Sequence, residues 1–257
     1  MHCGSASDVA RYIEEHRNMR LEDQLSSIEG MMDNVRKFKE LTPDLKILEI
    51  GPGDGWLQIY GRQQGLQITG LEVSEPLMEA AKEHARRHNT EINLILGNIE
   101  ESDLGSDQYD VIIARSIFEH VKNWQVGVER IFRALKPGGL FYFDSTNKFS
   151  FTSGEYDFPL YGWLPDNLRY KLRVSRQGPD IMILGIDFNQ FTYPQLRRFF
   201  KNIGFSNVFD LVDVKDASNL RTTSSLKKAM LGTLKGVPPL KHVALTFVPA
   251  TVFVCIK

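Results

Sequence analysis

The chain has 257 residues, of which 42% are hydrophobic, and its 31 basic and 32 acidic residues leave a formal net charge of -1. Nucleic-acid-binding proteins usually carry a strong basic excess, so this balance argues against a nucleic-acid partner. The length suits one large α/β core with a small cap. The polar first dozen residues and two widely separated cysteines, Cys3 and Cys255, lead us to expect a cytoplasmic protein with reduced thiols.

Helical and strand patterns alternate along the first two thirds of the chain. Residues 8–41 place apolar residues three or four apart, which predicts two helices ending before Pro43. Short apolar runs then predict strands at 46–50, 66–73, 92–98, 109–116 and 140–146, with helices at 75–89 and 124–136. This order is typical of parallel βαβ units in a doubly wound sheet.

The regular pattern stops near Asn147. Residues 147–190 are irregular and rich in aromatic side chains, which indicates a cap insertion. The order returns with a predicted helix at 193–204 and strands at 206–214 and 250–257, separated by a basic, partly helical insertion at about 215–242. We therefore divide the single domain into N-terminal helices (1–42), a cofactor-binding core (43–146), the cap (147–190) and a C-terminal part (191–257).

The stretch "LEIGPGDG", residues 48–55, places three glycines at alternate positions directly after the first predicted strand. Glycine lets another group approach the backbone closely, and glycines between a strand and a helix often seat a nucleotide. A dinucleotide fingerprint would need glycine or alanine where this chain has Trp56, which disfavours a nicotinamide or flavin cofactor. A glycine-rich turn without any ligand is the alternative.

Polar residues follow the next two predicted strands. Glu72 ends the second strand, where a carboxylate can accept hydrogen bonds from both ribose hydroxyls. Asn98 follows the third strand and can read an adenine edge. Each residue alone has an ordinary interpretation as a strand-end or loop residue.

Together and in this order, these residues resemble the class I S-adenosylmethionine-dependent methyltransferases, whose acidic-x-G-x-G-x-G motif "LEIGPGDG" matches in full. The resemblance implies a Rossmann-like, mostly parallel seven-stranded sheet with a late antiparallel strand. It also implies S-adenosyl-L-methionine as cofactor and S-adenosyl-L-homocysteine as product. The cofactor-binding residues that it implies are Glu49, Gly51, Pro52, Gly53 and Gly55 along the methionine and ribose, Glu72 and Val73 at the ribose, Asn98 and Ile99 at the adenine, and Arg115 under the methionine moiety.

The stretch from residue 114 to 148, "ARSIFEHVKNWQVGVERIFRALKPGGLFYFDSTNK", is similar to the O-methyltransferases of ubiquinone biosynthesis. This closer resemblance implies methyl transfer to a small molecule, with a hydroxyl oxygen as the expected acceptor atom and nitrogen or carbon left open. A catalytically inactive S-adenosylmethionine-binding module is the alternative. Those relatives carry E-x-x-E-H, proposed to hold a divalent metal. In this chain Ser116 stands in place of the first acid of that motif. A serine hydroxyl is a poor ligand for a hard cation, so we expect no metal site.

Methyl transfer to a hydroxyl benefits from a base that takes the acceptor's proton. His120 follows the fourth predicted strand and is the expected base; alternatively it only orients the next helix. His16, on a helix that could close over the cofactor, is a weaker candidate. His84 and His88 lie four apart on a predicted helix and suit either a metal or, as we favour, a solvated face.

The acceptor is expected under the cap, whose aromatic side chains suit a pocket for a planar or apolar molecule. The substrate candidates are Tyr156, Tyr161, Trp163 and Asn189, with Tyr170 and Asp187 as further possibilities. Alternatively, the aromatic side chains form the cap's own small core. The helical stripe of Leu226, Met230, Leu231 and Leu234 can rest on a membrane surface or, as we favour, pack on the domain. We expect no stable membrane insertion, and the oligomeric state is open.

Overall fold

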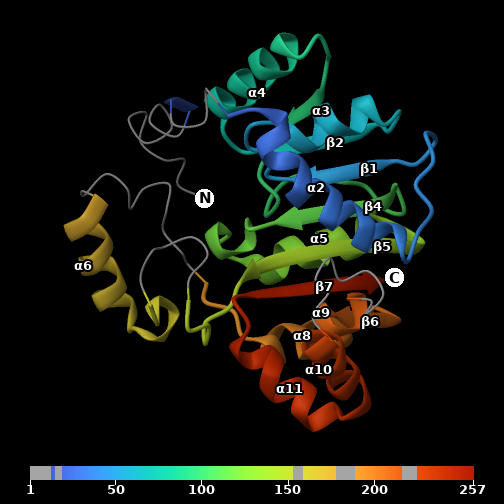
Figure 1. The fold of residues 1–257 in the computed structure, drawn as a ribbon. Coiled ribbons are helices and arrows are strands. Elements are labelled where there is room, and N and C mark those ends of the chain that lie inside the picture. Colours follow the sequence, from blue (N-terminus) through green and yellow to red (C-terminus); the bar gives the residue numbers. More distant parts are fainter. Residues whose placement is uncertain (1–12, 15–18, 153–158, 178–188, 216–224) are drawn as a thin grey trace.

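The computed structural model describes residues 13–14, 19–152, 159–177, 189–215 and 225–257. Seven strands form one sheet in this part of the chain, in the order β3-β2-β1-β4-β5-β7-β6 (Figure 1). The strands are β1 (Ile47–Ile50), β2 (Ile68–Glu72), β3 (Asn93–Leu96), β4 (Tyr109–Arg115), β5 (Leu135–Thr146), β6 (Asn207–Asp210) and β7 (Ala250–Ile256).

The sheet is parallel from β3 to β5, and β7 runs antiparallel to both of its neighbours, β5 and β6. The predicted mostly parallel α/β fold with a late antiparallel strand is therefore confirmed. The strand order reverses between β1 and β4. In such sheets, ligands bind in the crevice at the carboxyl ends of the strands, where the order reverses.

Helices cover both faces of the sheet. They are α2 (Leu21–Arg36), α3 (Trp56–Gln63), α4 (Glu75–Arg87), α5 (Trp124–Ala134), α6 (Asp166–Gln177), α8 (Tyr193–Ile203), α9 (Leu211–Val214), α10 (Ser225–Gly236) and α11 (Pro238–Phe247), with short 3₁₀ turns η1 (Phe118–His120) and η2 (Tyr161–Trp163). The helices α2, α3 and α4 contribute to the core on one face, and α5 and α8 contribute on the other. Figure 1 shows α6 standing to one side of this layered core.

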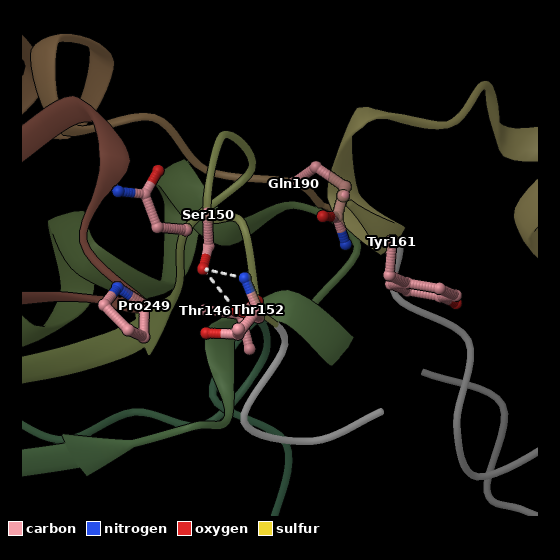
Figure 2. A pocket seen from close by; sticks show the side chains of 8 residues that line it. Thr146, Ser150, Thr152, Tyr161, Gln190 and Pro249 are labelled. Carbon is pink, nitrogen blue, oxygen red and sulfur yellow. Dashed lines mark hydrogen bonds between the residues drawn. The ribbon is translucent and has the colours of Figure 1, made fainter. Parts of the chain in front are cut away.

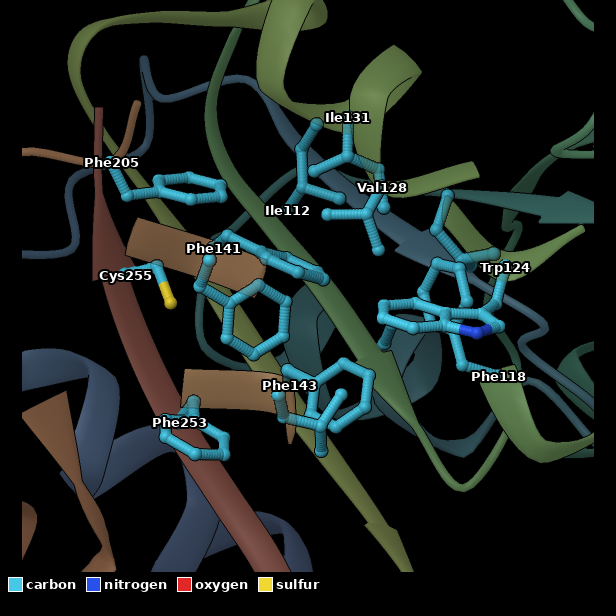
Figure 3. Close-up of a cluster of buried hydrophobic side chains, with 14 of the residues drawn as sticks. Ile112, Phe118, Trp124, Val128, Ile131, Phe141, Phe143, Phe205, Phe253 and Cys255 are labelled. Atoms are coloured by element: carbon cyan, nitrogen blue, oxygen red, sulfur yellow. The ribbon is translucent and has the colours of Figure 1, made fainter. Parts of the chain in front are cut away.

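Aromatic side chains dominate one of the two cores. Phe141 and Phe143 alternate along β5 with Leu140 and Tyr142, so that β5 contributes to both faces. The ring of Phe143 lies 5.3 Å from that of Phe200 on α8, and Phe253 of β7 completes the group (Figure 3). This packing fixes the carboxyl ends of β4 and β5, where the candidate site lies.

Three predicted elements differ in the structure. We expected one helix to end and another to begin near residue 25, but the single helix α2 continues through this position. Leu21, Ile28 and Met32 form one buried stripe along α2, which holds it together as one helix. The strand expected at 206–214 stops at Asp210, whose carboxylate accepts hydrogen bonds from the backbone N–H groups of Val212 and Asp213 and caps α9. The C-terminal insertion contains two helices, α10 and α11, and extends to Phe247 rather than to residue 242.

Candidate active site

The glycine loop lies between the end of β1 and the start of α3. Gly51, Gly53 and Gly55 all have positive φ, at 68°, 52° and 75°. A Cβ atom at Gly51 would lie 2.7 Å from Cδ1 of Ile117, and one at Gly55 would lie 2.9 Å from Cδ1 of Ile92. Both the backbone conformation and the close packing therefore require glycine at these positions.

Glu72 lies beside this loop at the end of β2 and is only 4% exposed. The backbone N–H of Ser74 donates to its carboxylate at 3.0 Å. Burial raises the pKa of Glu72, while hydrogen bonds from the backbone N–H groups of Ser74, Gly53 and Val73 act in the opposite direction. The acid is thus held against the glycine loop in a fixed orientation, as a bidentate acceptor for two hydroxyls requires.

Glu49 points from β1 and is 6% exposed. The side-chain amide of Gln58 on α3 donates to its carboxylate at 2.8 Å. Burial raises the pKa of Glu49 to about 7, although Gln58 and the positive charge of Arg115 lower it. A carboxyl group with this pKa changes its charge near neutral pH and is sensitive to a positive charge brought nearby.

The residues expected at the adenine follow β3. The side-chain oxygen of Asn98 accepts a hydrogen bond from the backbone N–H of Glu100 at 3.0 Å, which closes a local turn. Ile99 is 4% exposed and belongs to the aromatic core. Pro52 of the glycine loop packs close to Gly70 of β2, which places the loop over the neighbouring strand.

Arg115 ends β4 and contacts two different elements. Its guanidinium donates to Oγ of Ser27 on α2 at 2.8 Å, and its Nε lies 3.7 Å from Oδ2 of Asp144. Within the described part of the chain, this buried Nε has no hydrogen-bond partner. The carboxyl group of Asp144 is the acidic group that faces this Nε.

Asp144, near the end of β5, is a site residue that we did not predict. Its side chain accepts hydrogen bonds from the backbone N–H of Ser116 at 3.0 Å and from Oγ of Ser116 at 3.3 Å. Ser116 adopts a positive φ of 46°, which a non-glycine residue rarely does. Burial raises the pKa of Asp144, and Arg115 and Ser116 oppose this. The carboxyl group of Asp144 therefore lies directly beside Ser116.

Glu119 and His120 belong to η1, directly after β4. Glu119 is fully buried, and Oγ of Ser145 donates to it at 2.9 Å, whereas His120 is half-buried. Asn189 fixes this turn: its side-chain amide donates to the carbonyls of Phe118 at 3.0 Å and Val121 at 2.7 Å. Asn189 thus positions the turn that carries His120, a role that sequence reasoning did not assign to it.

The predicted substrate residues fall into separate environments. Tyr161 is buried and lines a small cavity with Thr146, Asn147, Ser150, Thr152, Gly162, Gln190 and Pro249 (Figure 2). Trp163 is 42% exposed on the molecular surface, and Tyr170 is also exposed. Tyr156 and Asp187 lie outside the described residues, as does His16.

His84 and His88 do not form a plain solvated helix face. Both rings pack edge-on against Trp56, at 3.9 Å and 5.5 Å between centroids, and Nδ1 of His84 lies 2.9 Å from the backbone carbonyl of Asp54. These contacts support the glycine loop from outside. Among the residues that the structure describes, no group of three or more His, Cys, Asp or Glu side chains is arranged to hold a metal ion.

The comparisons with known proteins agree with this geometry. Residues 48–143 match the family model described as "Methyltransferase domain". The chain is 25% identical to the ubiquinone biosynthesis O-methyltransferase of Rickettsia prowazekii (strain Madrid E), over 84% of this chain and 85% of that protein. It is 28% identical to the protein of the same name from Rickettsia bellii, over 53% of this chain. This match spans only 58% of the Rickettsia bellii protein.

Two solved structures show the same fold. One is phosphoethanolamine N-methyltransferase 2 of Haemonchus contortus, in complex with phosphomonomethylethanolamine and S-adenosylhomocysteine. It aligns with a TM-score of 0.58 at 17% identity, and the alignment covers 89% of this chain and 52% of that protein's chain. An S-adenosylmethionine-dependent methyltransferase of Mesorhizobium loti has a TM-score of 0.56 at 17% identity and covers 91% and 97% of the two chains.

The fold is that of a Rossmann-like domain, and the glycine loop lies within the residues 48–143 that match a methyltransferase domain. The resemblance inferred from the sequence motifs is confirmed: the chain contains a methyltransferase domain and is similar to S-adenosylmethionine-dependent methyltransferases, among them the O-methyltransferases of ubiquinone biosynthesis.

Proposed function

We propose that this protein transfers a methyl group from S-adenosyl-L-methionine to a small-molecule acceptor, with a hydroxyl oxygen as the acceptor atom. The observation that carries the proposal is the buried carboxylate of Glu72 held against a glycine loop of positive φ, at the carboxyl edge where the strand order reverses. The names of the similar proteins support the reaction class.

The described residues fit the cofactor. Glu72 offers a fixed acceptor for the ribose hydroxyls, and the glycine loop provides the close backbone approach that a nucleoside needs. Arg115, at the end of β4, is the cation that we assign to the methionine carboxylate. Glu49, whose pKa is about 7, lies where a cationic amino group would stabilise its ionised form. Asn98 and Ile99 border the adenine in this proposal.

The cofactor, when bound, supplies a methyl group already activated by a sulfonium charge. The protein has to align the acceptor, exclude water and remove a proton. We assign to His120 the role of the base that accepts the proton of the acceptor hydroxyl. His120 lies in the turn that the side-chain amide of Asn189 holds in place. Tyr161 and its small cavity lie toward the cap, where we place the acceptor.

The test is product formation. The full chain is incubated with S-adenosylmethionine labelled in its methyl group and a metabolite extract, and labelled products are separated and their methylated atom is identified by NMR. A labelled methyl ether supports the proposal. A methylated nitrogen or carbon contradicts the oxygen assignment, and cofactor binding without any labelled product, with extracts from several sources, contradicts the enzymatic assignment in favour of a binding module.

A further inference from the structure

Arg115 is held between two elements at the carboxyl edge of the sheet. Its Nε lies 3.7 Å from Oδ2 of Asp144 on β5, and its guanidinium donates to Oγ of Ser27 on α2 at 2.8 Å. The side chains of Arg115 and Asp144 are only 29% and 17% exposed. An ion pair this far withdrawn from water is screened less than a fully exposed pair, so Asp144 has a strong influence on where the guanidinium lies.

Asp144 also fixes the backbone that follows Arg115. The backbone N–H of Ser116 donates both to the carbonyl oxygen of Asp144 and to its carboxyl group, each at 3.0 Å. The positive φ of Ser116, 46°, is strained for a residue with a Cβ, and these hydrogen bonds offset the strain. The next residue, Ile117, packs beside Gly51 of the glycine loop. The conformation of Ser116 therefore decides how this turn meets the loop.

The carboxyl group of Asp144 is itself held in place from its own strand. Tyr142 lies two residues earlier on β5, and therefore on the same face of the sheet, and its hydroxyl forms a hydrogen bond with Asp144. Burial raises the pKa of Asp144, whereas the charge of Arg115 and the hydrogen bonds from Ser116 and Tyr142 lower it. Three neighbours thus fix one carboxyl group in a single orientation.

Helix α2 restricts the same group of side chains from the face of the sheet. It lies over β1, β4 and β5, where its buried residues join the core (Figure 1). Like the other helices in the described ranges, it is too short or too polar to span a membrane. Ser27 of α2 contacts Arg115, and the buried Asn34 of α2 forms a hydrogen bond with Tyr142. One packed helix therefore holds both ends of the network that contains Asp144.

We propose that Asp144 is a positioning residue for the amino acid end of the cofactor, because it aims the guanidinium of Arg115 and holds the turn at Ser116. The inference rests on the proposed function, in which Arg115 binds the methionine carboxylate. An arginine that is already held in one orientation loses less conformational entropy when it binds a carboxylate. Ser27 is a neutral partner, so the positive charge of Arg115 is compensated on one side only.

A direct contact between Asp144 and the amino group of the cofactor is the competing assignment. The carboxyl group of Asp144 already faces Arg115, Ser116 and Tyr142. Glu49 is the acid that we assign to the amino group, and its carboxyl group accepts a hydrogen bond from the side-chain amide of Gln58. Asp144 therefore acts through Arg115 and Ser116, and a ligand without the carboxylate should not sense it.

The test measures the affinity of the full chain for three nucleosides by isothermal titration. S-adenosylhomocysteine has both the carboxylate and the amino group, its decarboxylated analogue keeps only the amino group, and methylthioadenosine has neither. Asp144→Asn keeps an oxygen that accepts from Ser116 but loses the charge that faces Arg115. It should weaken the binding of S-adenosylhomocysteine about three- to thirtyfold and leave the affinities for the other two unchanged. Arg115→Gln should show the same selectivity, and the double variant should bind no more weakly than Arg115→Gln alone.

Two further variants separate positioning from stability. Asp103→Asn removes an acid that pairs with Arg133 at 3.1 Å on the exposed surface, and this matched control should bind all three nucleosides as the wild type does. Ser116→Gly in the Asp144→Asn background relieves the strain of the positive φ. This second substitution should raise the temperature of unfolding without restoring the affinity for S-adenosylhomocysteine, which a purely structural role of Asp144 would not allow.

Several results would overturn the proposal. Equal or tighter binding of S-adenosylhomocysteine by Asp144→Asn would show that Asp144 competes for Arg115 instead of positioning it. Equal weakening of all three nucleosides would show a structural role alone. Weaker binding of the decarboxylated analogue, with methylthioadenosine unchanged, would place Asp144 on the amino group. Failure of the wild type to bind any of the three would refute the proposed cofactor site itself, and this inference with it.

Discussion

Replacing Glu49 by glutamine should stabilise the cofactor-free protein at alkaline pH. The carboxyl group of Glu49 is 6% exposed, and burial raises its pKa from the ordinary 4.5 to about 7. A carboxyl group whose pKa is raised by folding holds its proton more tightly in the folded chain than in the unfolded chain. Its contribution to stability is therefore fully present below about pH 4.5 and is lost as the pH rises through 7.

The size of the effect follows from these two pKa values. Between pH 5 and pH 8 the wild type should lose about 2.5 kcal/mol of unfolding free energy through this group alone. Glu49→Gln lacks the titration but keeps an oxygen that accepts from Gln58, so its curve should be flatter by about that amount. Urea unfolding at both pH values measures the difference, with Glu101→Gln, at an exposed acid, as the control.

If the unfolding free energies of the wild type and of Glu49→Gln change equally between pH 5 and pH 8, burial does not raise the pKa of Glu49 and this reasoning is refuted. The proposed cofactor adds a second readout, because a positive amino group beside Glu49 lowers its pKa. Binding at pH 7 should then release up to about half a proton, measured by calorimetry in buffers of different ionisation enthalpy. Binding with no proton release in the wild type would place the cation elsewhere.

Three further perturbations address the glycine loop and the proton-transfer turn. Gly51→Ala should lower the unfolding free energy by about 1–3 kcal/mol, because alanine is strained at a positive φ and its Cβ would clash with Ile117. Gly65→Ala is the control: Gly65 also has a positive φ, but no atom lies within 4 Å of its added Cβ. Thermal unfolding should show a smaller loss of stability for Gly65→Ala. His120→Ala should lower turnover about 10²–10⁴-fold without changing the affinity for S-adenosylhomocysteine. A chelator should leave the turnover of the wild type unchanged. Loss of turnover in the chelator that magnesium restores would show that a metal ion takes part in the reaction. Asn189→Ala should lower both stability, by about 1–3 kcal/mol, and turnover, whereas loss of stability alone would show that the turn does not position His120.

The sequence was sufficient for the fold wherever a local pattern decides the structure. The alternation of strands and helices from residue 46 to 146 predicts the parallel sheet, because strands buried on both faces read as continuous apolar runs. The predicted end of β6 was wrong by four residues, because Asp210 caps the helical turn α9. The apolar residues of that turn continue the strand-like sequence pattern. The break expected inside α2 was wrong because the packing of Ile28 and Met32, not the local pattern, decides it.

The site was predictable where residues are close in the chain and not where the sheet brings them together. Asp144 contacts Ser116, which lies 28 positions earlier in the chain, because Arg115 of β4 pairs with Asp144 of β5. The sequence does not reveal this register. An acid next to the end of a predicted central strand was the signal available. The aromatic side chains of the cap gave no indication that Tyr161 is buried and Trp163 exposed, since both are amphipathic and lie two residues apart.

The most direct test is whether the carboxyl edge of β1, β2 and β4 seats the cofactor. Isothermal titration of S-adenosylhomocysteine into the full chain should show one site, and Glu72→Ala should weaken it by about 1.5–3 kcal/mol, the value of a hydrogen bond to a charged group. The exposed Glu79→Ala on α4 serves as the control and should bind as the wild type does. No binding to the wild type, or equal affinity in Glu72→Ala and wild type, would contradict the cofactor site described above.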